Sequence, residues 1–357
     1  MISSNPDWLR MTAALLLACA LSHRLTPAVK TLAEFLGAVD QPGGRRIHRR
    51  PVPRMGGLAI CAGFFAAALL FGRLTRPVTG LLLGALIIAL MGAADDLIEL
   101  SPRQKLAWQL AAALTAMAFG VRIDFLSRPG GAEAFFALGQ LSAPLTLLWL
   151  VGCTNAVNLI DGLDGLAAGV SAISSLTLFE AALLAGQPDA ALLLSALAGA
   201  CLGFLPYNFN PAVIFMGDVG SQFLGFVLAC VSVIGAFKFH TLLTFAVPVL
   251  ALLLPLADTV CSFFRRLLRG QSPFRADRGH FHHRLLAMGL SQKRAAATLY
   301  ASSALPGLAA LFLAGRGRAM RIACLLLGAL ILVLLDRFVL RRRRTEGGRE
   351  KRRGLAD

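Results

Sequence analysis

The chain has 357 residues, of which 57% are hydrophobic and only 15% are charged, and its formal net charge is +16. Soluble globular proteins carry charged side chains at about a quarter of their positions. The composition therefore excludes an ordinary soluble enzyme and indicates a polytopic membrane protein. The basic residues are spread over many short segments without a recognition module, so we expect no nucleic-acid partner.

Taken in chain order, eleven apolar stretches are long enough to be membrane-spanning helices, which need about 20 mostly apolar residues. They lie near residues 8–27, 55–72, 78–94, 106–120, 141–157, 164–185, 188–206, 220–237, 241–262, 297–315 and 319–339. No basic segment precedes the first stretch, so we interpret it as a helix and not as a cleaved signal peptide. The pattern predicts an all-α fold with one transmembrane domain over residues 1–340 and a disordered basic tail over 341–357.

The distribution of Lys and Arg predicts the orientation, because both residue types favour the cytoplasmic side of a membrane. With eleven spans and the amino terminus outside, one set of loops and the tail together hold 26 of the 35 basic residues. The loops of this cytoplasmic set are 40–54, 95–105, 155–165, 207–219 and 263–296. The carboxyl terminus lies on the same side. Much of the net charge is explained by this topology and by attraction to anionic membrane lipid.

The first polar stretch, "GAADDL" at 92–97, places Asp95 and Asp96 at the end of an apolar segment. An ionised side chain at membrane depth costs roughly 2.5–3.5 kcal/mol even on insertion scales. Two interpretations remain open from this stretch alone. The carboxylates cap a helix end or pair with Arg103 and Lys105, or they hold a divalent cation against substrate phosphates.

The second stretch, "NAVNLIDGLDGLAAG" at 155–169, spaces four polar side chains three residues apart: Asn155, Asn158, Asp161 and Asp164. This spacing places them around one side of a helix end. Gly162 and Gly165, which follow the two aspartates, leave room for a ligand to approach the backbone. A turn with Asx caps would explain one Asn and one Asp but not all four, so a binding site is favoured.

The third stretch, "NFNPAVIFMGDVGS" at 208–221, places Asp218 just before an apolar span. An Asp at this position either caps the helix or belongs to a helix amino terminus that binds an anion. The fourth stretch, "ADRGHFHHRLL" at 276–286, contains His280, His282 and His283. A transition-metal site is an alternative for these histidines, but the neighbouring Arg275 and Arg278 favour contact with a phosphate.

The motifs "RRIHRRPVPRMGG", "GAADDL", "NAVNLIDGLDGLAAG", "NFNPAVIFMGDVGS", "PLADT" and "ADRGHFHHRLL" follow one another in this order. In this order, over residues 40 to about 290, the chain resembles the polyprenyl-phosphate N-acetylhexosamine-1-phosphate transferases. Pentapeptide transferases of peptidoglycan synthesis read Thr-Pro-Thr-Met-Gly-Gly where this chain has "VPRMGG", and three consecutive histidines where it has "HFHH". The resemblance therefore favours the undecaprenyl-phosphate N-acetylglucosamine-1-phosphate transferase branch, with the pentapeptide transferase as the alternative.

The resemblance implies that undecaprenyl phosphate attacks the β-phosphate of a UDP-N-acetylhexosamine, giving a lipid-linked sugar and UMP. It implies Mg²⁺ as the cofactor, with Mn²⁺ as a substitute. The predicted location is the bacterial inner membrane, with the active site facing the cytoplasm and the product starting a cell-envelope glycan such as lipopolysaccharide or teichoic acid. A homodimer is left open.

The resemblance also implies roles for single residues. Asp218 is the expected Mg²⁺ ligand, with Asp95 and Asp96 nearby as further catalytic and metal-binding residues. Asp95 would orient or deprotonate the polyprenyl phosphate, and a covalent role for Asp95 as nucleophile remains an alternative.

The remaining candidate residues are expected to bind substrate. The uridine and diphosphate side is assigned to Asn158, Asp161 and Asp164. The diphosphate and the sugar are assigned to His280, His282, His283, Arg275 and Arg278. The lipid phosphate is assigned to Arg45, Arg46 and His48.

Three rival classes explain the sequence less well. A cation-coupled transporter would place ionisable residues near mid-membrane and show repeated halves, but Asp258 lies toward the inner end of its predicted span and no internal repeat is visible. A CDP-alcohol phosphatidyltransferase would continue past "DGLDG" with further aspartates, whereas this chain continues "LAAGVSAISS". An inactive scaffold is disfavoured because no acidic position of the family pattern is missing.

Overall fold

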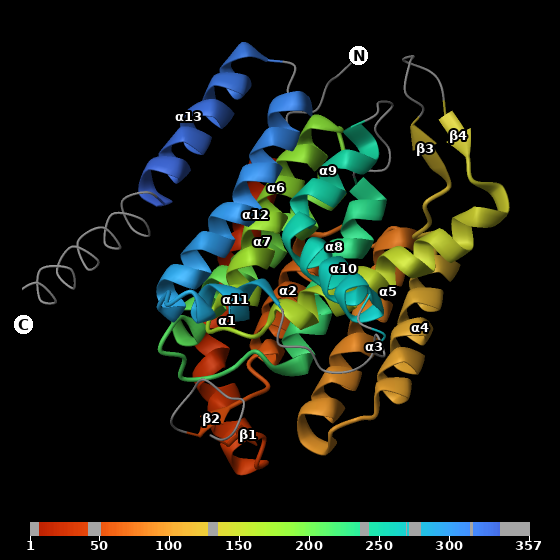
Figure 1. Ribbon diagram of the computed structural model, residues 1–357. Helices are drawn as coiled ribbons and strands as arrows, with labels where there is room; N and C mark the ends of the chain where they lie inside the picture. Colours follow the sequence, from red (N-terminus) through yellow and green to blue (C-terminus); the bar gives the residue numbers. More distant parts are fainter. Residues whose placement is uncertain are drawn as a thin grey trace, which may run out of the picture.

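The computed structural model describes residues 7–41, 51–127, 135–235, 243–268, 270, 280–314 and 317–335. Within these ranges the protein is a bundle in which most of the long helices run side by side (Figure 1). The helices are α1 (Trp8–Phe35), α2 (Gly57–Phe71), α3 (Arg76–Ile98), α4 (Pro102–Ala118), α5 (Ser142–Ile160), α6 (Leu166–Leu184), α7 (Pro188–Asn208), α8 (Gly217–Gly235), α9 (Leu243–Ala251), α10 (Leu253–Leu268), α11 (Phe281–Ala287), α12 (Gln292–Ala314) and α13 (Arg318–Leu335).

Eight of the described helices are long and apolar enough to cross a membrane: α1, α3, α5, α6, α7, α8, α12 and α13. Helix α2 is apolar but has only 15 residues, and α4 has 17. The polytopic character expected from the composition is therefore confirmed. The count of eleven spans and the orientation of the termini stay predictions.

The ninth predicted span, 241–262, is not one helix in the structure. It is divided into α9 and α10, with Leu252 between them. Proline explains the break, because Pro255 has no backbone N–H to donate to the carbonyl of Ala251 and its ring crowds that carbonyl.

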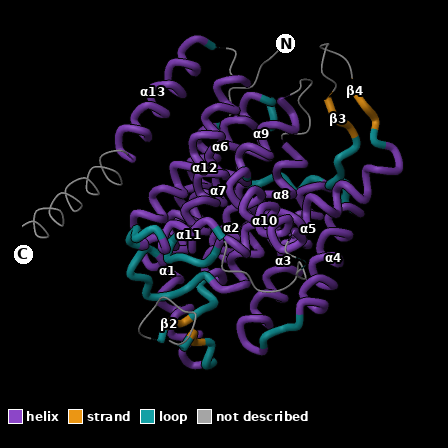
Figure 2. The backbone as a smooth tube through the Cα atoms, in the orientation of Figure 1, coloured by secondary structure: helices purple, strands orange, loops and turns teal. Residues whose placement is uncertain are grey.

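Two short antiparallel strand pairs add to the helices, which the all-α expectation did not include (Figure 2). Strand β1 (Val39–Asp40) pairs with β2 (Val52–Pro53), and β3 (Phe125–Ser127) pairs with β4 (Phe135–Ala137). The first pair is tied to the segment before α8, because Phe215 N donates to Pro53 O at 2.8 Å and Gly56 N donates to Phe215 O at 2.9 Å. This tie fixes one wall of the site described below.

Helix α8 lies at the centre of the bundle and packs against α3 and α5. Most residues of α8 are buried, whereas in α13, at the edge of the bundle in Figure 1, Cys324 alone is buried. The carboxyl ends of α3 and α5 and the amino ends of α8 and α11 meet near one another. The four polar stretches of the sequence therefore converge at one end of the bundle, as predicted, while the tail 341–357 lies outside the described residues.

Candidate active site

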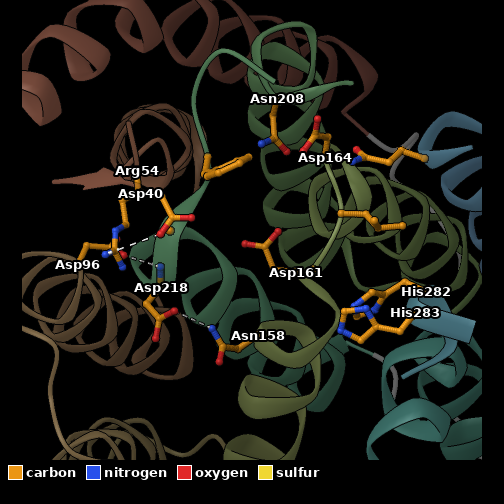
Figure 3. A pocket seen from close by; sticks show the side chains of 15 residues that line it. Asp40, Arg54, Asp96, Asn158, Asp161, Asp164, Asn208, Asp218, His282 and His283 are labelled. Carbon is orange, nitrogen blue, oxygen red and sulfur yellow. Dashed lines mark hydrogen bonds and ion pairs between the residues drawn. The ribbon is translucent and has the colours of Figure 1, made fainter. Parts of the chain in front are cut away.

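A cavity of about 400 Å³ lies where these helix ends meet. Seven of the candidate residues line it: Asp96, Asn158, Asp161, Asp164, Asp218, His282 and His283. Figure 3 shows these side chains around a common space, with the acidic residues of α3 and α8 on one side and the histidines of α11 on the other. Residues far apart in the sequence thus form one polar site.

Asp218, in the first turn of α8, has both carboxylate oxygens occupied by donors. Its Oδ2 accepts hydrogen bonds from Lys105 Nζ at 2.8 Å and from Gln222 Nε2 at 3.0 Å. Its Oδ1 accepts one from Asn158 Nδ2 at 3.1 Å. An acid is favourable at a helix amino terminus because of the helix dipole, so this carboxylate is held in place from three sides.

Lys105 also contacts Asp95, at 2.6 Å from Oδ2, and so bridges Asp95 and Asp218. Asp95 stands in the last turn of α3 and Lys105 in the first turn of α4, and both positions oppose the dipole of their own helix. Their mutual attraction offsets that cost. The pairing of Asp95 with Lys105, one of the two interpretations left open by the sequence, is thus present, together with a contact of Lys105 with Asp218 that the sequence does not reveal.

Asp95 and Asp96 point in different directions although they are neighbours. Asp95 Oδ1 accepts a hydrogen bond from Leu100 N at 2.7 Å, closing the turn after α3. Asp96 accepts from Asp218 N at 3.0 Å and from Val219 N at 3.3 Å, so that it caps α8 from another helix. Only Asp96 of the two lines the cavity.

Gly217 makes this cap possible. Its φ is +73°, and a Cβ at this position would lie 2.2 Å from Asp96 Oδ2. A side chain here would therefore clash with the carboxylate and strain the backbone.

Asp161 follows α5, and its side chain makes no hydrogen bond or ion pair with any residue that the structure describes. Figure 3 shows its carboxylate directed into the cavity. Burial, together with the negative charges of Asp218, Asp96 and Asp164, raises the pKa of Asp161 to about 7. The site thus has an excess of negative charge that a bound cation would relieve.

Asp164 has a different environment. Its Oδ2 accepts from Asn210 Nδ2 at 2.8 Å and from Ala212 N at 3.0 Å. The side chain of Asn208, which also lines the cavity, accepts a hydrogen bond from Gly165 N at 3.1 Å and donates one to Ile214 O at 3.0 Å. These contacts hold the loop between α7 and α8 against the turn after α5.

The three histidines belong to one short segment at the start of α11. His280 Nδ1 lies 2.8 Å from Asp258 Oδ2, and Phe281 N donates to Asp258 Oδ1 at 2.8 Å. Asp258 is 2% exposed, so this buried carboxylate of α10 anchors the amino end of α11. His282 and His283 pack against each other, with ring centroids 4.2 Å apart, and line the cavity.

His282 fits closely against Gly162, where a Cβ would lie 2.3 Å from His282 Nε2. The glycine is therefore needed for the approach of this ring. Burial, with a smaller effect of the neighbouring His283 and His280, lowers the pKa of His282 to about 4, although the charge of Asp258 acts in the opposite direction. Near neutral pH, His282 is therefore an uncharged hydrogen-bonding group.

Five predicted basic residues lie outside the described residues: Arg45, Arg46, His48, Arg275 and Arg278. Conversely, the structure adds site residues that sequence reasoning missed. Lys105 appeared only as a partner for a helix end, and Arg54 only as part of "VPRMGG". A lysine nine residues after the "DD" pair and an arginine two residues before paired glycines are weak signals alone.

The donor set fits a hard divalent cation. Among the described residues no three His, Cys, Asp or Glu side chains form a ready-made metal cluster. Mg²⁺ does not require one, since it commonly binds one or two carboxylates and completes its shell with water and substrate phosphates. Asp161 supplies an unpaired carboxylate, and Asp218 lies across the same cavity.

The sequence was compared with known proteins. Residues 78–236 match the model of glycosyl transferase family 4. The "Probable undecaprenyl-phosphate N-acetylglucosaminyl 1-phosphate transferase" of Bacillus subtilis is 42% identical over 293 residues, covering 82% of each chain. The "Decaprenyl-phosphate N-acetylglucosaminephosphotransferase" of Mycolicibacterium smegmatis is 38% identical, over 80% of this chain and 77% of the relative. The "Phospho-N-acetylmuramoyl-pentapeptide-transferase" of Shouchella clausii is 33% identical, over 79% of this chain and 90% of the relative.

Proposed function

Because the chain belongs to glycosyl transferase family 4, we propose that it transfers N-acetylglucosamine-1-phosphate from a UDP-sugar to undecaprenyl phosphate and releases UMP. The relatives named above for N-acetylglucosamine-phosphate transfer support the sugar and the polyprenyl acceptor. The observation that carries the proposal is the convergence of Asp96, Asp161 and Asp218 from three separate stretches on one cavity.

The position of the cavity supports a reaction between a lipid and a water-soluble nucleotide. The cavity lies at the end of apolar helices, where the phosphate of a membrane lipid would meet a donor from the cytoplasm. A second cavity of about 440 Å³ follows α5 and α10 and is lined almost entirely by apolar side chains, among them Trp149 and Phe263. It suits the hydrocarbon chain of the acceptor, and the reaction would take place at the cytoplasmic face of the bacterial inner membrane.

Phosphoryl transfer requires charge neutralisation and in-line positioning more than covalent chemistry from the protein. Asn158 and Lys105 hold the carboxylate of Asp218, which would face the diphosphate of the donor. Asp95 would orient the acceptor phosphate through Lys105. His282 and His283 would donate hydrogen bonds to the diphosphate or the sugar from the opposite wall.

Mg²⁺ would be held by Asp218 and Asp161 and would neutralise the diphosphate when bound. In the absence of the ion, Lys105 shares its positive charge between Asp95 and Asp218. The direct attack of the lipid phosphate is our preferred course, since the carboxylate of Asp95 is occupied by Lys105 and by Leu100 N.

The test is an assay of the purified full-length chain with undecaprenyl phosphate and, in parallel, UDP-N-acetylglucosamine, UDP-N-acetylgalactosamine and the UDP-muramoyl-pentapeptide. We expect UMP release with UDP-N-acetylglucosamine, its loss in Asp218→Asn, and its loss on chelation of divalent cations. Turnover of the pentapeptide donor alone would assign the chain to the other branch. Near-normal turnover in Asp218→Asn would refute the site.

A further inference from the structure

Arg54 stands on the cavity wall opposite His282 and His283 (Figure 3). It follows β2, and its backbone N donates to Ala38 O at 2.9 Å. The adjoining Pro53 O accepts from Phe215 N at 2.8 Å. The backbone of Arg54 is thus tied on both sides, so its guanidinium group is carried by a fixed support.

The guanidinium group itself is only loosely held. Its Nη2 lies 4.0 Å from Asp40 Oδ1 and 3.7 Å from Glu99 Oε1, and both distances exceed that of a hydrogen bond. Glu99 is highly exposed, with 79% of its side chain accessible, so that water weakens this ion pair. The Nε atom of Arg54 is buried and has no hydrogen-bond partner among the residues that the structure describes.

An unpaired buried donor is unfavourable, and natural structures seldom leave one without a reason. A guanidinium group presents its donors in a planar fork that matches the oxygens of a phosphate. Among the described residues that line the cavity, Arg54 is the only arginine or lysine. A phosphate in the cavity would meet several carboxylates and this one permanent positive charge.

We propose that Arg54 binds a phosphate group of a substrate in this cavity. Its guanidinium group, which Asp40 and Glu99 approach only beyond hydrogen-bond distance, would donate hydrogen bonds to the phosphate oxygens. The inference rests on the proposed function for the identity of the substrates. The phosphate belongs either to the diphosphate of the nucleotide sugar or to the lipid acceptor, and the kinetic arms of the test distinguish the two.

The kinetic test compares Arg54→Ala and Arg54→Lys with the parent chain. Each substrate is varied while the other is saturating. Loss of a charged hydrogen bond predicts a rise in KM of about 10- to 100-fold for the substrate whose phosphate is bound. Arg54→Lys keeps the charge but not the fork, so we expect a smaller rise of about tenfold or less.

Two control variants separate phosphate binding from a purely structural ion pair. Arg103→Ala removes an exposed arginine from the neighbouring α4 and should leave both KM values unchanged. Glu99→Gln removes the nearer of the two carboxylates beside Arg54 and should leave KM unchanged or lower it. If Glu99→Gln raises KM as much as Arg54→Ala does, Arg54 acts through its ion pair and the proposal is overturned.

A binding measurement works without turnover. Calorimetric titration of the detergent-solubilised protein with pyrophosphate should give binding that weakens at least about tenfold in Arg54→Ala. If the parent chain turns over no nucleotide sugar but binds pyrophosphate through Arg54, the proposed function fails and the role of Arg54 stands. If Arg54→Ala and Arg54→Lys match the parent chain in titration and in both KM values, the proposal is overturned. Size-exclusion elution of each variant checks its fold.

Discussion

Replacing Lys105 with methionine should destabilise the protein in the absence of divalent cations. The ammonium group lies 2.6 Å from Asp95 and 2.8 Å from Asp218, and it is 30% exposed. Removal of one partner from a fully buried ion pair costs about 3–5 kcal/mol. Solvent screening reduces this value, and Asn158 and Gln222 still donate to Asp218, so we expect a loss of about 2 kcal/mol.

The pKa of Lys105 supports this magnitude. Burial lowers the pKa of this ammonium group, but the charge of Asp218 and hydrogen bonds to Asp218 and Asp95 outweigh burial and raise it above the usual value for lysine. A raised pKa in the folded state means that the stabilisation is fully present below the ordinary lysine pKa and is lost only as the pH rises through the folded value. The bridge is therefore intact at neutral pH.

The assay is thermal unfolding in detergent, followed by the fluorescence of the three tryptophans with a chelator present. A loss of about 2 kcal/mol corresponds to a fall in Tm of about 3 °C for a protein of this size. Added Mg²⁺ should raise the Tm of Lys105→Met more than that of the parent chain, because the bound cation would replace the positive charge that the variant lacks beside Asp95 and Asp218. Lys293→Met, an exposed lysine in the first turn of α12, is the matched control and should change little. Equal Tm values for Lys105→Met and the parent chain would refute the reasoning.

Three further predictions concern the cavity. The pKa of Asp161 is about 7 in the folded chain, so between about pH 4 and 7 the folded state binds a proton that the unfolded state does not. The free energy of unfolding should therefore fall as the pH rises through that window, by at most about 4 kcal/mol. Urea titrations in chelator should show this slope in the parent chain and not in Asp161→Asn. Gly162→Ala should displace the ring of His282 and raise KM for the donor at unchanged Tm, as steady-state assays would show; an unaltered KM would contradict the contact. Asp258→Asn removes the charge that faces His280 but keeps a hydrogen-bonding side chain, so kcat should fall at least about tenfold with a shifted pH profile while the protein still elutes as the parent does.

Much of the architecture could be predicted because membrane helices are recognisable in a sequence by their length and apolar composition. The apolar stretches and the convergence of the acidic motifs at one end both follow from that pattern and from the distribution of Lys and Arg. The division of α9 from α10 could also have been read from Pro255, since a proline three residues into a helix removes a hydrogen bond to the preceding turn. The loop strands are too short to leave a periodic signal.

The candidate site was predictable in its residue types but not in its pairings. Nothing in the local sequence indicates that Asp258 meets His280, or that Asp96 caps α8, because both contacts join segments distant in the chain. Lys105 illustrates the difference. Its pairing with Asp95 follows from their proximity across the short connection between α3 and α4, whereas its contact with Asp218 depends on how α4 and α8 pack.

The cap that Asp96 supplies to α8 constrains how the site can move. Two backbone amides at the start of α8 depend on the buried carboxylate of Asp96 from α3 as their hydrogen-bond acceptor. Sliding of one helix along the other would leave those amides without a hydrogen-bond acceptor, so α3 and α8 are held together as one rigid unit. A displacement of α3 by a lipid that contacts its outer surface would therefore also move the amino end of α8 and Asp218 in its first turn.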